Sequence, residues 1–139
     1  MTDTIKAKML ELLKQDRKRE YLDLCKQNYT QAVSVVQELF PEFYVERDPF
    51  ESLYDKAMEK KKQGNTDEEI QILEMAIASR SVMPYCYERL AILYSKANNH
   101  RKAYEICMKW FDSGFWKMPN SLTTSLKLLD RLEKLKEKT

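Results

Sequence analysis

PYCYERLAILYSKANNHRKAYEICMKWF, residues 84–111, is the stretch that decides the expected fold of this chain. Apolar residues recur every three or four positions on both sides of Asn98 and Asn99, which is the spacing of a buried helix face. We therefore predict helices over about 84–97 and 100–112, with Pro84 opening the first. The two asparagines form the turn, because asparagine tolerates the left-handed backbone region. The segment is thus one helical hairpin.

A spacing of 34 residues relates this hairpin to its neighbours. Three pairs of a small residue followed by a large apolar one keep that spacing: Ala57-Met58, Ala91-Ile92 and Ser125-Leu126. Pro49, Pro84 and Pro119 recur at 35. A fixed period in this range indicates stacked copies of one supersecondary unit. Such a unit cannot bury its apolar face alone, so its copies stack, and the stack is typical of a binding surface rather than a catalyst.

The same register predicts the neighbouring elements. Helices are expected over about 50–63 and 67–79, joined by a turn at Gly64-Asn65, with a capping box formed by Thr66 and Glu69. Gly114 ends the helix over 100–112. A last helix begins near Pro119 and carries a leucine stripe at positions 122, 126, 129, 132 and 135. With no partner helix after it, this helix is expected to cap the stack.

Residues 84–111 resemble a tetratricopeptide repeat. Tyr87, Leu90, Ala91 and Tyr94 match that family's first helix, and Ala103 matches the alanine of its second. Residues 50–83 are a looser copy, which keeps the pattern at Leu53 and Ala57 but has Lys60 and Glu69 where the family has a tyrosine and an alanine. The resemblance implies about two repeats plus a C-terminal capping helix, stacked as a short α-solenoid.

The first part of the chain is helical but does not follow the repeat. Apolar residues at helical spacing predict helix over about 4–26, in which the polar run Lys14–Glu20 is either a solvated face or a break between two helices. Another helix covers about 30–40 and ends before Pro41. Residues 41–49 form a connector. We expect one continuous all-α domain of six to seven helices, with an N-terminal helical segment at 1–48 and the repeats with their cap at 49–139.

Composition excludes several classes of protein. The 24 Lys and Arg oppose 22 Asp and Glu, giving a net charge of +2, which is far from the strongly basic balance of a dedicated nucleic-acid binder. Cys25, Cys86 and Cys107 are scattered without a C-x-x-C pair, so we predict buried, reduced thiols, no metal and no cofactor. No apolar run reaches the ~20 residues of a membrane span, and no secretory signal is present. A cytoplasmic protein is expected.

The resemblance also implies the binding site, because first helices line the inner groove in that family. By register, the expected partner-binding residues are Tyr54, Met58, Lys61, Tyr85, Glu88, Arg89, Ile92 and Ser95. This mixture of aromatic, apolar and charged groups suits an extended peptide or a partner helix. Only Arg89 matches the Lys, Asn and Arg set with which a subclass of the family clamps a C-terminal carboxylate, so that chemistry is not expected.

Non-enzymatic binding of another protein is the predicted function, as an adaptor, a regulatory subunit or an inhibitor. His100 is the only histidine, and no nucleophile motif or phosphate loop accompanies it, so no enzyme activity is expected. One alternative is a nucleic-acid accessory that uses the basic segments 17–19 and 60–62. Another is a homodimer formed through the leucine stripe. The aromatic group Trp110, Phe111, Phe115 and Trp116 is either core, which we favour, or an exposed anchor.

Overall fold

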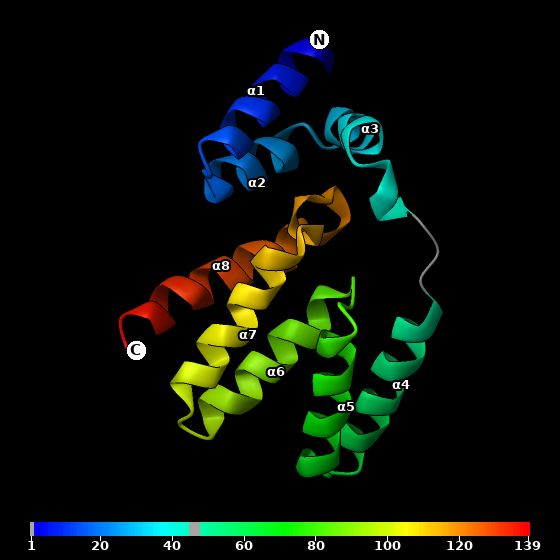
Figure 1. Ribbon diagram of the computed structural model, residues 1–139, viewed down its shortest axis with the longest axis vertical. Helices are drawn as coiled ribbons and strands as arrows, with labels where there is room; N and C mark the ends of the chain where they lie inside the picture. The colour runs from blue at the N-terminus through cyan, green and yellow to red at the C-terminus, as the bar shows by residue number, and fades with distance from the viewer. Residues whose placement is uncertain (1, 45–47) are drawn as a thin grey trace.

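The protein is all-helical, as predicted. A computed structural model describes residues 2–44 and 48–139, and these two ranges contain no strand. The α-helices of the described chain are α1 (Thr2–Lys14), α2 (Lys18–Gln27), α3 (Tyr29–Leu39), α4 (Asp48–Lys62), α5 (Thr66–Ala78), α6 (Pro84–Lys96), α7 (His100–Ser113) and α8 (Leu122–Lys136). Short 3-10 turns are η1 (Pro41–Tyr44), η2 (Phe115–Lys117) and η3 (Pro119–Ser121). Figure 1 shows α4 to α8 as a row of neighbouring helices, with α4 and α8 on opposite sides.

The turns α4–α5 and α6–α7 are built alike, 34 residues apart. Gly64 and Asn98 both have a left-handed backbone, with φ of 71° and 59°, so asparagine replaces glycine there as predicted. The next residue caps the following helix: the Asn65 side chain accepts from the backbone N–H of Glu68, and the Asn99 side chain accepts from that of Lys102. The predicted capping box is therefore wrong. Asn65 lies one residue earlier than Thr66 and already satisfies an N–H group at the helix end.

The small residues of the 34-residue spacing lie in the core. Ala57, Ala91 and Ser125, the three positions 34 residues apart, are each 0% exposed. Helices that meet at small side chains reach the short end of the usual 8–10 Å separation. Ser125 also accepts a hydrogen bond of 2.9 Å from the indole N–H of the buried Trp110, which joins α7 to α8. The repeated small residues therefore have a packing role.

The polar run Lys14–Glu20 contains a break between α1 and α2. Asp16 has a left-handed φ of 56°, and the Arg17 N–H donates to the carbonyl of Leu12, which closes the end of α1. The two helices fold back on each other as a hairpin, and both contact α3. Of the two alternatives for this run, the break is thus the one that occurs, and it accounts for the additional helix.

The N-terminal segment packs against α8 through α2 (Figure 1). The Tyr21 hydroxyl donates to the Lys117 carbonyl at 2.8 Å, and its ring meets Trp116 edge-on at 5.4 Å. The Arg19 guanidinium donates to Asp130 at 2.9 Å and also to Glu133. The expectation that α8 ends the stack without a partner helix is wrong, because α2 covers it. Leu129 and Leu135 of the leucine stripe are buried.

The aromatic group around the end of α7 belongs to the core. Trp110, Phe111, Phe115 and Trp116 are all buried, as favoured from the sequence. Gly114, with φ of 84°, ends α7 and lets the chain turn into η2, whose Phe115 and Trp116 are buried. All three cysteines are also buried. None of the described helices is long and apolar enough to span a membrane.

Candidate functional site

The predicted binding residues lie on α4 and α6, which supply three and five of them. We name this set (Tyr54, Met58, Lys61, Tyr85, Glu88, Arg89, Ile92 and Ser95) the α4–α6 face. Tyr54 and Tyr85 come together across the two helices, with ring centroids 6.2 Å apart. Tyr85 is 55% exposed, which makes it one of four large hydrophobic side chains that the described chain exposes. The α4–α6 face therefore contains an aromatic pair that spans its two helices.

Arg89 is the member of this set that is least available to a partner. Its guanidinium donates two hydrogen bonds to the Glu69 carboxylate, at 2.7 and 3.2 Å. Glu69 is 1% exposed, and the Arg89 side chain is 21% exposed. Such a bidentate pair is geometrically specific. Arg89 thus holds α6 to α5 and leaves little of its charge for a partner.

The remaining members differ in how much they present to solvent. Lys61 is exposed, whereas Met58, Glu88 and Ile92 are half-buried. The hydroxyl of Ser95 is buried and has no hydrogen-bond partner in the described part of the chain. Tyr85 and Lys61 are therefore the two exposed members of the α4–α6 face. Either side chain could contact another molecule without breaking an ion pair that the structure shows.

Beside this face lies a polar contact that the sequence did not reveal. The Tyr94 hydroxyl donates to the Glu74 carboxylate, and the Lys102 ammonium lies 5.4 Å from the centre of the Tyr94 ring. Burial, together with the Glu74 carboxylate, raises the pKa of Tyr94 to about 12. Glu74 lies on α5 and Tyr94 on α6, 20 residues away, so no local pattern joins them.

The basic segments proposed for nucleic acid are largely neutralised within the protein. Arg17 pairs with Glu20, Lys18 with Asp16, and Arg19 with Asp130 and Glu133. Lys60 pairs with Glu68 at 2.8 Å, which raises the pKa of Lys60 and lowers that of Glu68. Lys61 and Lys62 are exposed. Phosphate binding needs several uncompensated cations together, and the pairing removes most of them.

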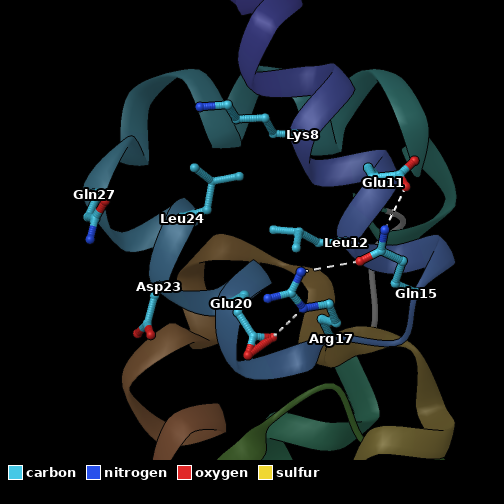
Figure 2. A pocket seen from close by; sticks show the side chains of 9 residues that line it. All are labelled: Lys8, Glu11, Leu12, Gln15, Arg17, Glu20, Asp23, Leu24 and Gln27. Carbon is cyan, nitrogen blue, oxygen red and sulfur yellow. Dashed lines mark hydrogen bonds and ion pairs between the residues drawn. The ribbon is translucent and has the colours of Figure 1, made fainter.

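A groove between α1 and α2 was not foreseen. It has a volume of about 410 Å³, and its lining is Lys8, Glu11, Leu12, Gln15, Arg17, Glu20, Asp23, Leu24 and Gln27. We name it the α1–α2 groove. Figure 2 shows Leu12 and Leu24 pointing into the space between the two helices, with Lys8 reaching across it. A prediction of the α1–α2 break would have indicated this hairpin.

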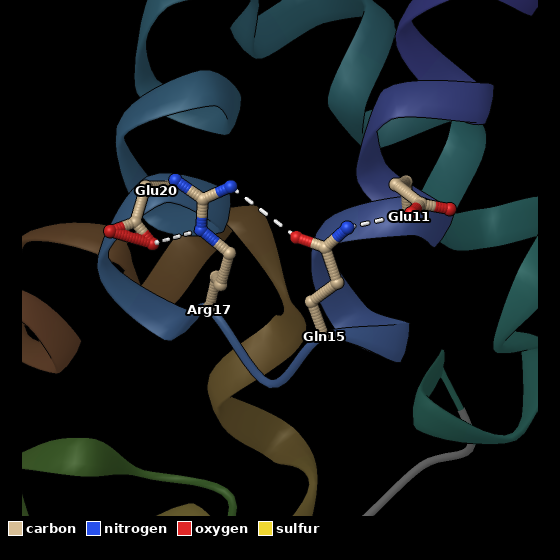
Figure 3. Close-up of polar contacts among 4 residues, drawn as sticks. All are labelled: Glu11, Gln15, Arg17 and Glu20. Carbon is tan, nitrogen blue, oxygen red and sulfur yellow. Dashed lines mark hydrogen bonds and ion pairs between the residues drawn. The ribbon is translucent and has the colours of Figure 1, made fainter.

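One end of the α1–α2 groove is closed by a chain of polar contacts (Figure 3). The Gln15 amide donates to Glu11 at 2.6 Å, and Arg17 donates to the Gln15 oxygen at 3.3 Å and to Glu20 at 3.2 Å. These contacts bridge the two helices and fix the side chains at that end. Arg17 is consequently satisfied by groups of the protein itself.

The cysteines, the histidine and the carboxylates are the side chains that metal or nucleophile chemistry would use. No group of three or more His, Cys, Asp or Glu side chains among the described residues could hold a metal ion. Burial raises the pKa of Cys25 to about 11 and that of Cys107 to about 12, which favours the protonated thiols at neutral pH. His100 stands at the first position of α7, and its Nδ1 atom is buried without a partner in the described ranges.

Comparison with family models, with curated proteins and with solved structures gave no significant match.

Proposed function

We propose that this protein is a non-enzymatic binding module that engages another polypeptide through the α4–α6 face, in an array of the tetratricopeptide type. The exposed Tyr85 ring, packed on Tyr54, is the observation that carries the proposal. Exposed tyrosines on a rigid support are typical of residues that dominate binding energy, because they bury a large area with little loss of side-chain freedom.

The array itself is supported by equivalences that keep the 34-residue period. Ala57, Ala91 and Ser125 are fully buried, and the Gly64-Asn65 and Asn98-Asn99 turns have the same backbone and the same cap. Hairpins α4–α5 and α6–α7 pack side by side, and α8 follows. Each repeated feature is a local requirement of a stacked helical hairpin.

Rigidity of the face is supported by the buried Arg89–Glu69 pair. The two hydrogen bonds fix α6, which carries five of the eight predicted binding residues, against α5. A preformed surface binds with a smaller loss of conformational entropy. Arg89 therefore acts in this proposal as a positioning residue, and Tyr85 and Lys61 act as contact residues.

The test is a comparative affinity capture from cells that make the protein, followed by mass spectrometry. Wild type, Tyr85→Ser and Lys61→Glu are compared with Met75→Ser, a matched control, since Met75 is 57% exposed on α5 outside the face. The proposal predicts proteins that are captured by wild type and Met75→Ser but lost with Tyr85→Ser. Equal capture by all four variants contradicts it.

A nucleic-acid accessory is the second candidate, favoured only by the exposed Lys61 and Lys62. It predicts RNA or DNA retention that falls steeply with salt.

A further inference from the structure

The α1–α2 groove has the shape of a seat for a third helix. The side chains of each wall are separated by four and then three residues. The α1 wall has Lys8 and Leu12, followed by Gln15 in the turn just after α1, and the α2 wall has Glu20, Leu24 and Gln27. These are the row spacings by which the side chains of one helix fit between those of others. The hairpin already packs on α3, and α2 packs on α8, so the groove is a separate and open side.

A helix fits this groove better than an extended peptide does. The floor is made by the half-buried Leu12 and Leu24, which offer no hydrogen bonds. An extended chain laid over them would leave its backbone N–H and C=O groups without partners on that side. An α-helix satisfies those groups internally and presents apolar side chains to the two leucines.

Charge identifies the chemistry of the occupant. Arg17 and Glu20 neutralise each other, and Glu11 accepts from Gln15. Lys8 on the α1 wall and Asp23 on the α2 wall have no ion-pair partner among the described residues. The Gln15 amide is neutral, so Glu11 keeps its negative charge, and the α1 wall carries one ammonium group, at Lys8, and one carboxylate, at Glu11. The α2 wall keeps the unpaired Asp23 carboxylate. A helix with a basic flank and an acidic flank can satisfy both Lys8 and Asp23 in only one direction, because reversal exchanges the flanks.

We infer that the α1–α2 groove docks an amphipathic helix of a partner protein, with leucines on Leu12 and Leu24, a basic side chain at Asp23 and an acidic one at Lys8. This surface is distinct from the α4–α6 face, and the inference does not depend on the function proposed for that face. Its contacts are of the helix-in-groove kind, in which apolar anchors supply affinity and flanking charges supply orientation.

Two synthetic helical peptides of about 20 residues, long enough to be helical on an alanine background, test the inference. Both carry one leucine stripe; one peptide is bipolar, with a lysine flank and a glutamate flank, and the other has glutamate on both flanks. Binding to the full chain is measured by fluorescence anisotropy. Wild type is expected to prefer the bipolar peptide, and Asp23→Lys is expected to prefer the glutamate peptide, with the ratio of affinities changing by about fivefold or more.

Glu137→Lys is the matched control, because it makes the same charge change at an exposed residue beyond α8. It must keep the wild-type preference. Leu24→Gln must weaken both peptides while retaining the wild-type circular dichroism, and methyl resonances of Leu12 and Leu24 must shift on titration. The charge variants test the inference even where Leu24→Gln fails to fold.

Three outcomes overturn the inference: no saturable binding of either peptide, the same preference in Asp23→Lys and Glu137→Lys, or loss of peptide binding in Tyr85→Ser. The last result would place the peptide on the α4–α6 face, and would count against the groove while leaving the proposed function intact. Conversely, if Tyr85→Ser loses its cellular partners but still binds the peptides, the α4–α6 face and the α1–α2 groove bind independently.

Discussion

Glu69 is the only charged side chain that is buried among the described residues, and Arg89 is what makes its burial tolerable. Removing one partner of a buried pair leaves an uncompensated charge, whereas replacing both by apolar groups removes the problem. We expect Arg89→Met to lower the free energy of unfolding by about 3 kcal/mol. The double variant Glu69→Leu with Arg89→Met should recover most of that loss in urea unfolding.

The control for this prediction is Arg101→Met. Arg101 pairs with Glu105 on the surface of α7, and its side chain is 85% exposed, so its loss should change stability by less than about 0.5 kcal/mol. Equal effects of Arg89→Met and Arg101→Met would show that the Glu69 pair has no special structural role.

Buried thiols make stability depend on alkaline pH. Burial raises the pKa of Cys25 from 9.0 to about 11. The folded state holds the Cys25 proton more tightly than the unfolded state does. The resulting contribution of Cys25 to the free energy of unfolding is therefore complete below pH 9 and is lost as the pH rises through 11. The melting temperature should therefore fall more steeply between these values in wild type than in Cys25→Ala. Parallel profiles for the two proteins would contradict this assignment.

At the scale of the element, the two equivalent turns allow a matched test. Gly64 has a left-handed backbone, and a Cβ atom added there would meet no other atom within 4 Å. Gly64→Ala should therefore cost about 1 kcal/mol from backbone strain alone. Gly64→Asn should cost clearly less, because Asn98 occupies the corresponding place in the next hairpin. The same loss for both substitutions in chemical denaturation would refute the equivalence.

Local signals explain which elements could be predicted from the sequence. The turn at Asn98-Asn99, the helix start at Pro84 and the end at Gly114 depend on backbone preferences of single residues, and all three are confirmed. The capping box failed because Asn65 and Thr66 are adjacent and both able to cap. The fate of Lys14–Glu20 stayed undecided, since polar residues suit a solvated helix face as well as a turn.

Contacts between distant elements account for what the sequence could not show of the candidate site. The eight predicted residues lie on α4 and α6, but the register could not show that Arg89 is engaged by Glu69, which stands where the tetratricopeptide pattern has alanine. The α1–α2 groove was missed for the same reason. A helical pattern indicates which side chains face inward, and it does not indicate which helix lies opposite.

At the scale of the whole molecule, α8 packs against α6 and α7 and also against α2 of the N-terminal segment. Leu129 is 8% exposed, so the leucine stripe is not a free dimerisation surface. We expect wild type to scatter light as a 16.6 kDa monomer at all concentrations. Leu129→Glu should lower the melting temperature, because it buries a carboxylate, and should leave the mass unchanged. A concentration-dependent mass that Leu129→Glu abolishes without loss of stability would instead support the homodimer.

The most direct test of the central claim, that the α4–α6 face grips another polypeptide, is photo-crosslinking in cells that make the protein. A photoreactive phenylalanine analogue is placed at Tyr85 in one variant and at Met75 in the other, both being exposed sites. The account predicts a discrete crosslinked product, containing a second protein, from position 85 and none from position 75. No product from position 85, or the same products from both positions, would contradict it.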